Sequence, residues 1–439
     1  MVAAIFPIAA LLLSVFILLL GSGLHGTIVP IRANVESFSP LAIGVLGASY
    51  YVGYVVGCIG CPYAVKRVGH IRAFTAFGAV ASVASLTHAL MIDEVTWWVL
   101  RFLTGICFAG LYMVIESWLN ERSTAKNRGR VLSVYQIINL SALALGQQLL
   151  NVANPGSFEL FGISSILISL ALVPIALSTA MAPAPLKAVR IRLKWLYSVS
   201  PVGVIGCASV GMVNGAFWTL APVFAQRSLL SISEIATFMS VSIIGGALLQ
   251  YPLGLLSDQI DRRWTIIIAC IGGALVGAGL TLFSGTSGLV LLVLSCAYGG
   301  FAFPLYALCM AHANDSAENE DFVDISSGLL LVYGIGAVAG PLLAASVMEV
   351  AGPASLFSYT AIIHLLAALF AYYRMKKRVA LAPAERDNFV AVPLTTPAIS
   401  EIVPLAPEEP ISTAEENTDL ESSTSAEPSE SINQQSNGA

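Results

Sequence analysis

The residues best placed to do chemistry in this sequence are polar side chains that interrupt long apolar runs. Arg101, Tyr112 and Glu116 lie in one such run, and Arg101 and Tyr112 share a helical face because eleven residues separate them. A charge inside a bilayer is costly and therefore indicates function. We expect Arg101 to bind an anionic substrate or to modulate proton transfer, with extension of its guanidinium to the membrane surface as the structural alternative. Glu116 is expected to be a proton site or the ion-pair partner of a basic loop.

Neutral polar residues form a second group at helical spacing. Residues three or four apart share one face of a helix, so two such pairs can each line a cavity, and two tyrosines can line its other side. Hydrogen bonding between helices, or plain packing, is the alternative for each of them. The candidates are Gln136 and Asn139, Asn214 and Trp218, and Tyr306 and Tyr333.

The elements that must position these residues are membrane-spanning helices. The chain has 439 residues, of which 56% are hydrophobic and 11% charged, and its mean hydropathy is +0.81. A soluble domain carries about 25% charged residues, so the composition predicts an all-α integral membrane protein. A helix needs about 20 apolar residues to cross the bilayer. Twelve segments qualify, namely 4–32, 40–64, 71–91, 95–118, 130–152, 160–181, 199–225, 234–256, 265–284, 287–311, 325–348 and 355–374.

The distribution of Lys and Arg predicts the orientation of these helices. Basic residues gather in alternate connections, and the basic connections of a membrane protein are the cytoplasmic ones. The clusters lie at 66–72, 122–130, 187–194, 262–263 and 374–378. Both termini are therefore expected in the cytoplasm. The connection 314–324 lies on the same side but is acidic, which calls for an explanation of its own.

Other parts of the sequence bound the function. Residues 379–439 are rich in Pro, Ser, Thr and Glu, which predicts a disordered acidic cytoplasmic tail. The sequence has no long basic tract for nucleic acid and no phosphate-binding loop for ATP. Cys58 and Cys61 have the spacing of metal ligands but lack a second pair or a histidine. No metal, cofactor or catalytic cluster is expected, so an enzyme is not predicted. We expect a monomer whose partners are membrane lipid, a small-molecule substrate and protons.

The chain also repeats itself. A shift of 192 residues superimposes Gly53 on Gly245 and Lys66 on Asp258, so one charged hinge occurs twice with its charge reversed. A repeat of this length predicts two six-helix halves related by an axis along the membrane normal, with a site between them. The expected parts are a first half at 1–181, a cytoplasmic linker at 182–198 and a second half at 199–378.

The second hinge resembles a family signature. Residues 254–263 read GLLSDQIDRR, and the major facilitator superfamily has G-x-L-x-D-R-x-G-R-K between its second and third helices. The first copy, 62–72, departs further from that pattern, and the family's R-x-x-x-G motif occurs at 101–105. The segments RFLTGICFAG, ESWLN and NRGRVLSVYQ resemble the YcaD-like branch of bacterial permeases. The resemblance covers roughly residues 1–378 and implies twelve helices that move a solute by alternating access.

The resemblance further implies a gate at the cytoplasmic ends of the helices. In the family, the hinge between helices 2 and 3 docks against the start of helix 11, and the hinge between helices 8 and 9 docks against the start of helix 5. Applied to this chain, each hinge charge would then meet charges of opposite sign. The expected pairs are Lys66 and Arg67 with Asp321 and Asp324, and Asp258 with Arg128 and Arg130, while Arg262 and Arg263 complete the second hinge. Ordinary solvated loop charge is the alternative.

These features predict a secondary active transporter that moves a small organic solute across a bacterial cytoplasmic (inner) membrane. Glu116, Arg101 and the resemblance make proton coupling an expectation, and uptake and export are equally compatible with the sequence. The rival interpretation is a receptor-like or scaffold membrane protein on a transporter fold, which signals through its acidic tail.

Overall fold

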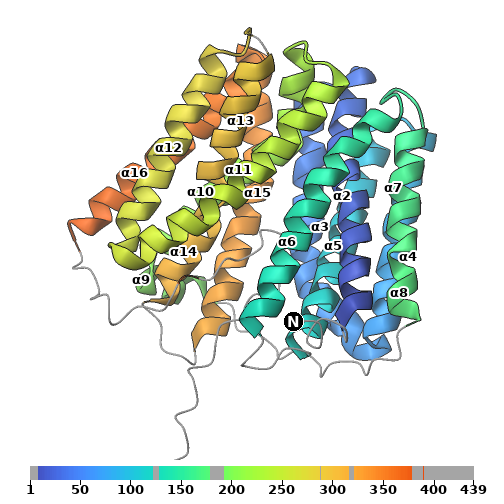
Figure 1. Ribbon diagram of the computed structural model, residues 1–439, viewed down its shortest axis with the longest axis horizontal. Helices are drawn as coiled ribbons and strands as arrows, with labels where there is room; N and C mark the ends of the chain where they lie inside the picture. The colour runs from blue at the N-terminus through green and yellow to red at the C-terminus, as the bar shows by residue number, and fades with distance from the viewer. Residues whose placement is uncertain are drawn as a thin grey trace, which may run out of the picture. The chain divides into compact units, whose positions relative to one another are not determined.

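The apolar segments of the chain fold into long α-helices that run beside one another (Figure 1). The computed structural model describes residues 8–121, 128–177, 192–286, 288–315, 321–377 and 389, and these ranges contain helices and turns but no strand. Eleven spans are long and apolar enough to cross a membrane. They are α2 (Ala9–Val35), α3 (Pro40–Val68), α4 (His70–Leu90), α5 (Glu94–Glu121), α7 with α8 (Glu159–Leu170, Leu172–Ala176), α10 (Pro201–Arg227), α11 (Ile232–Gln259), α12 (Arg262–Leu282), α13 with α14 (Gly288–Ala302, Leu305–Asn314), α15 (Phe322–Ala351) and α16 (Ser355–Met375).

One predicted segment, 130–152, has a different character. It forms α6 (Arg128–Gln148) and the short 3-10 helix η2 (Leu149–Val152), so the helix is confirmed. It is not one of the eleven apolar spans, because polar residues such as Gln136 and Asn139 interrupt it. α6 nevertheless packs against the apolar helix α2 (Figure 1), and toward its C-terminal end it also contacts α11. A further short helix, α9 (Leu193–Val199), precedes α10.

The two charged hinges are shorter than the sequence suggested. The break between α3 and α4 is Gly69 alone, whose φ of +87° suits a glycine. The break between α11 and α12 is Ile260 and Asp261, and the Asp261 side chain accepts a hydrogen bond from the first turn of α12. Lys66 and Asp258 therefore lie in the last turns of α3 and α11. This corrects the expectation that both charges occupy loops.

Paired glycines give the two halves of the chain the same helix packing. α3 lies so close to α5 that a Cβ atom on Gly53 would be 2.0 Å from the carbonyl oxygen of Phe102. α11 approaches α13 in the same way, because a Cβ atom on Gly245 would be 1.8 Å from the carbonyl oxygen of Cys296. Only glycine fits at such distances. The repeat seen in the sequence therefore recurs as an equivalent contact between helices.

The hydrophobic core is continuous at one end of the helices and divided at the other. We call the end where α2 and α10 finish the Asn34 end, and the end where α11 finishes the Asp258 end. All described residues belong to one compact unit, 1–403. One core cluster joins residues of both halves, such as Ile28 and Phe217, toward the Asn34 end. Toward the Asp258 end each half has a cluster of its own. The two halves are thus held together mainly at the Asn34 end.

Candidate functional site

Arg101 is positioned by the contact between α5 and α3. A Cβ atom on Gly105 would lie 2.1 Å from the carbonyl oxygen of Tyr50, so the helices touch one turn after Arg101. This approach brings the guanidinium carbon of Arg101 to 4.4 Å from the centre of the Tyr50 ring. A guanidinium over an aromatic face is a favourable cation–π arrangement. The R-x-x-x-G spacing therefore has a physical meaning. Gly105 lets α3 approach closely enough for Tyr50 to lie under the guanidinium of Arg101.

Tyrosines connect Arg101 to the second half of the chain. The ring of Tyr51 meets that of Tyr50 edge-on at 5.3 Å. Tyr51 packs against the core cluster of the second half and interacts electrostatically with Tyr333 of α15. Tyr333 in turn meets Tyr306 of α14 edge-on at 5.2 Å between ring centres. Arg101, Tyr306 and Tyr333 thus belong to one cluster that bridges the two halves.

Two buried polar groups in this cluster have hydrogen-bonding capacity to spare. Asn214 of α10 is fully buried beside the hydroxyl of Tyr333. The Asn214 amide interacts with that hydroxyl and has capacity for further hydrogen bonds, whereas the hydroxyl of Tyr306 makes none among the described residues. Buried polar groups are nearly always satisfied, so each of these asks for an explanation. A polar ligand held between the halves would supply one.

Glu116 lies nearer to the C-terminal end of the same helix, about 22 Å from Arg101 at 1.5 Å per residue. It is 1% exposed, and Tyr54, Tyr112 and Tyr135 lie in its surroundings. The ring of Tyr54 is also 6.2 Å from that of Tyr50, so a line of tyrosines runs from Glu116 to the Arg101 cluster. The expected alternative, an ion pair with the basic loop at 122–127, falls outside the described residues.

The remaining candidates are divided between the site and the core. Asn139 is buried beside Tyr135, in the surroundings of Glu116. Gln136 is half-buried on the same helix, and its amide oxygen has no partner among the described residues. Trp218 stacks on Phe303 at 5.4 Å and packs against the continuous core, so it is a packing residue.

Sequence reasoning missed the residues that complete the site. Tyr50, Tyr51 and Tyr54 occur in the stretch SYYVGY at 49–54, on the helix that carries Gly53. Polar-residue counting passed over them because tyrosine is common in apolar helices. The available signal was the presence of three tyrosines within five residues next to Gly53, which corresponds to Gly245 in the repeat. A glycine of this kind marks the closest approach of two helices.

Side-chain hydrogen bonds tie the two halves together at the Asn34 end. The Asn34 Nδ2 group donates to Gln226 Oε1 at 2.9 Å, and the Arg227 Nε group donates to Asn34 Oδ1 at 2.8 Å. Asn34 and Gln226 are 192 residues apart, so they are equivalent positions that meet across the repeat axis. Between α6 and α11, Gln148 donates to the Ser240 hydroxyl at 2.8 Å.

The acidic residues at the Asp258 end have partners other than those expected. Arg192 Nη2 lies 3.2 Å from Asp321 Oδ1 and 3.1 Å from Asp324 Oδ2. In the described part of the chain neither acid pairs with Lys66 or Arg67, which are both exposed, so that expectation is wrong for this structure. The divided core explains the difference, because it leaves the acids of α15 to a basic residue near their own half.

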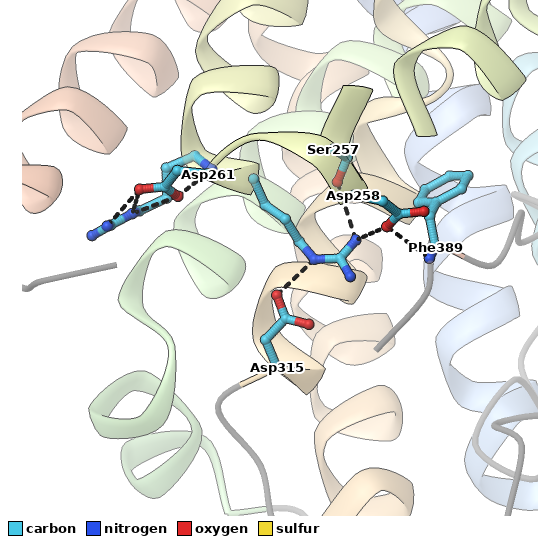
Figure 2. A network of polar contacts seen from close by, with 7 residues as sticks. Ser257, Asp258, Asp261, Asp315 and Phe389 are labelled. Atoms are coloured by element: carbon cyan, nitrogen blue, oxygen red, sulfur yellow. Dashed lines mark hydrogen bonds and ion pairs between the residues drawn. The ribbon is translucent and has the colours of Figure 1, made fainter. Parts of the chain in front are cut away.

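Asp258 also has local partners (Figure 2). Its Oδ1 atom accepts a hydrogen bond from the backbone N–H of Phe389 at 2.9 Å and lies 3.3 Å from Arg262 Nη1. Arg130, an expected partner, is exposed. The side chain of Arg128, the other expected partner, lies outside the described residues, so that pairing stays a prediction.

The basic pair of the second hinge forms ion pairs within its own half. Arg262 is 1% exposed, and its Nε group is 2.6 Å from Asp315 Oδ2. Arg263 Nη2 is 2.6 Å from Asp261 Oδ2. Burial alone would raise the pKa of Asp261, but the hydrogen bonds and charge of Arg263 outweigh it, so that pKa lies below its ordinary value. These ion pairs tie the start of α12 to the end of α14 and to the hinge residue Asp261.

Comparison with known proteins places these features in a family. The sequence model described as Major Facilitator Superfamily matches residues 11–320 and 203–411. The MFS-type transporter YcaD of Escherichia fergusonii is 28% identical over 349 residues, which cover 78% of this chain and 89% of that protein. YcaD of Shigella flexneri is 27% identical over 354 residues, with the same coverage.

Solved structures show the same fold at low sequence identity. The crystal structure of the nucleoside transporter NupG has a TM-score of 0.69 at 13% identity and covers 85% of this chain and 99% of its own. A bacterial homologue of the human lysosomal transporter Spinster, in an inward-facing and occupied conformation, has a TM-score of 0.69 at 14% identity, covering 87% and 98%. At these identities the likeness concerns the fold alone.

Proposed function

Because this chain belongs to the Major Facilitator Superfamily, we propose that it is a secondary active transporter of a small organic solute in a bacterial cytoplasmic membrane. In this proposal α6 is the twelfth crossing, and both termini face the cytoplasm. The halves 1–181 and 199–378, joined by the linker 182–198, swing against each other around the solute. The packing of α6 against α2 and α11 supports its crossing, despite its polarity.

The observation that carries the proposal is the polar cluster between the halves. Arg101 and Tyr51 come from the first half, and Asn214, Tyr306 and Tyr333 come from the second. The cluster lies where the continuous core gives way to the divided one. A solute bound there touches both halves, which is what alternating access requires of a transport site.

The divided core supports a particular state of the transport cycle. Toward the Asp258 end each half buries its own apolar residues, whereas toward the Asn34 end both halves share one core. With the termini in the cytoplasm, the Asp258 end is the cytoplasmic one. The protein is then closed toward the outside and separated toward the inside.

Glu116 is the proton carrier in this proposal. An ionisable side chain inside a membrane span is costly and is the kind of residue that forms proton relays in transporters. The tyrosine line that leads from Glu116 through Tyr54 to Tyr50 couples its charge to the site of Arg101. Loading and release of the proton would then alter the electrostatics around the bound solute.

Reconstituted vesicles with an imposed pH gradient test the proposal. A defined mixture of small organic acids, amines, sugars and nucleosides is supplied outside, and mass spectrometry identifies what the vesicles gain or lose. The wild-type chain should accumulate or expel at least one solute in response to the gradient. Glu116→Gln should abolish that response, whereas Glu121→Gln, an exposed change at the end of the same helix, should keep it.

Two results would count against different parts of the proposal. If no solute moves in either direction, transport itself is refuted. If a solute moves equally well without the pH gradient, transport stands and proton coupling through Glu116 falls.

A further inference from the structure

The charge of Arg101 narrows the class of the solute. We propose that the transported solute is an organic monoanion with a planar apolar body, and that its carboxylate binds Arg101. The inference rests on the proposed function and adds the chemistry of the solute to it. Three observations carry it: the charge balance of Arg101, the residue at the equivalent place in the second half, and the groups that surround the guanidinium.

Arg101 differs from the buried arginines at the Asp258 end. Arg262 and Arg263 each have a carboxylate oxygen at 2.6 Å. Among the described residues Arg101 has no ion pair, and its Nε atom is buried without a hydrogen-bond partner; its contact is the face of Tyr50. An arginine fork matches a carboxylate with two parallel hydrogen bonds. A bound carboxylate would therefore balance the charge of Arg101 and accept hydrogen bonds from its guanidinium.

The repeat indicates that the fold does not need an arginine at this position. Tyr50 corresponds to Ser242 through the 192-residue shift, and further along the chain, where the shift grows to 194, Arg101 corresponds to Ser295. The hydroxyls of Ser242 and Ser295 bond to each other where α11 and α13 meet. Two serines thus satisfy the same helix contact that carries an arginine and a tyrosine in the first half. The packing of α3 against α5 therefore does not require the charge of Arg101, which leaves a functional role for it.

The groups around Arg101 suit a planar body. The rings of Tyr50, Tyr51, Tyr306 and Tyr333 present aromatic faces and edges, which favour stacked or edge-on rings. The amide of Asn214, which also interacts with Tyr333, can both donate and accept, so it can orient a polar substituent. Within this cluster the one formal charge is that of Arg101, so a neutral or cationic solute would leave it unbalanced.

Three probes of nearly equal shape test the inference, namely benzoate, benzamide and benzamidine, which are negative, neutral and positive. Binding is read from the thermal unfolding of the purified full chain in detergent over a range of probe concentrations. Benzoate should bind about tenfold more tightly than benzamide, because hydrogen bonds to a charged group are the stronger ones. Arg101→Gln should remove the preference. Arg72→Gln, at an exposed position on α4, should retain it.

Each other outcome overturns part of the inference. Equal stabilisation by the three probes, a preference for benzamidine, or stabilisation by none of them refutes the anionic solute. A preference for benzoate that survives in Arg101→Gln refutes the role of Arg101. These binding results do not decide whether the chain is a transporter. That question is answered by the vesicle experiment, which measures the movement of solutes of every class. Accumulation of a neutral or cationic solute there would leave transport standing and remove the anion.

A second, independent observation concerns Phe389, which lies against the last two turns of α11 (Figure 2). Its N–H group bonds to Asp258 at 2.9 Å, and its ring packs against the core of the second half. The three atoms nearest to a Cβ built on Gly254 all belong to the Phe389 ring, the closest at 2.3 Å. The side chain of Phe389 therefore fills the space that the glycine leaves on α11.

We infer that Phe389 is a brake on closure of the Asp258 end. It covers Gly254 and occupies Asp258, two residues of the hinge that the family resemblance leads us to expect opposite the start of α6. If closure seats the first half on that surface, Phe389 has to leave it. Docking of Phe389 therefore favours the separated state of this end, and its release permits closure.

Spin labels across the Asp258 end test the brake without knowledge of the solute. Exposed labelling positions are provided by Tyr63→Cys on α3 in the first half and by Tyr197→Cys on α9, in the linker beside the second half. Phe389→Ala should raise the short-distance population about fivefold, from the loss of a partly buried aromatic side chain. Gly254→Ala should have the same effect, because its Cβ displaces the ring, and the double variant should add nothing. Gly60→Ala on α3, with nothing within 4 Å of its Cβ, is the control.

The brake is refuted by several outcomes of this experiment. Unchanged distances in Phe389→Ala, or a shift in that variant which Gly254→Ala does not reproduce, would contradict it. So would additive shifts in the double variant, because the two changes would then act at separate places. Thermal unfolding of each variant establishes that it is folded before its distances are compared.

Discussion

Asn34→Ala should open the Asn34 end of the molecule. The change removes the bond to Gln226 at 2.9 Å and the bond from Arg227 at 2.8 Å, which join the two halves at equivalent positions of the repeat. A net hydrogen bond contributes about 0.5–1.5 kcal/mol, and the exposed bond to Arg227 lies at the lower limit. Their loss should therefore shift the balance by about 1–2 kcal/mol, a factor of about 5–30 in favour of the open state.

Distance measurements between spin labels can follow this shift. Phe158→Cys and Leu229→Cys, 63% and 94% exposed in the native residues, lie at this end in the first and second half. The seven native cysteines are buried or half-buried, so they compete little for a bulky label. In lipid nanodiscs, Asn34→Ala should increase the ratio of long to short distances by about 5–30.

A matched control separates the bridge from general effects at this end of the helices. Asn154 is exposed in the same region, and its side chain accepts a hydrogen bond from Gly156 within its own half, so Asn154→Ala should leave the distances unchanged. Gln226→Ala should resemble Asn34→Ala, and the double variant should be less than additive, because both changes break one bond. An unchanged distance ratio in Asn34→Ala would refute the view that these side chains close this end.

Two other predictions follow from the packing and the charges. Gly53→Ala and Gly245→Ala should each destabilise the protein by about 1–3 kcal/mol through overpacking, because their Cβ atoms would lie 2.0 Å and 1.8 Å from a carbonyl oxygen. Gly60→Ala meets no atom within 4 Å and should have no effect on thermal unfolding, so equal stability of all three variants would contradict the reasoning. Asp261→Asn should lower the unfolding midpoint at pH 7, because Arg263 holds the pKa of Asp261 below its ordinary value. This contribution is complete above the unfolded pKa of about 3.9 and is lost as the pH falls through the lower folded pKa, so the two midpoints should converge in acid, and a gap that persists there would refute the assignment.

The sequence was sufficient for the helices because the bilayer imposes a length and a polarity on each crossing. Within the described residues each predicted span contains helix, and only 130–152 is ambiguous as a crossing, since Gln136 and Asn139 make it polar enough to obscure its apolar pattern. The internal repeat was also readable, because Gly53 and Gly245 are required by backbone contacts that tolerate no side chain. Such constraints act on single positions and therefore leave a local signal.

The site was only partly predictable, for a different reason. Arg101 and Asn214 could be singled out because polar groups in apolar helices are costly, but Tyr51 owes its place to a partner on the other half. The pairing of Asp321 and Asp324 failed in the same way. Which base an acid meets depends on how the halves are separated, and the state of the transport cycle leaves no pattern in the sequence.

The distribution of strong and weak contacts explains how such a molecule can alternate. All six ion pairs among the described residues lie within one half, or between the second half and the adjoining Arg192. The bonds that cross between the halves at the Asn34 end are side-chain hydrogen bonds, which exchange with water at little net cost. Buried pairs such as Arg262 with Asp315 are costly to break, since a separated charge would remain inside the protein. Each half therefore stays rigid during a swing that breaks only the weaker contacts, and an ion pair introduced between Asn34 and Gln226 should halt the cycle with this end closed.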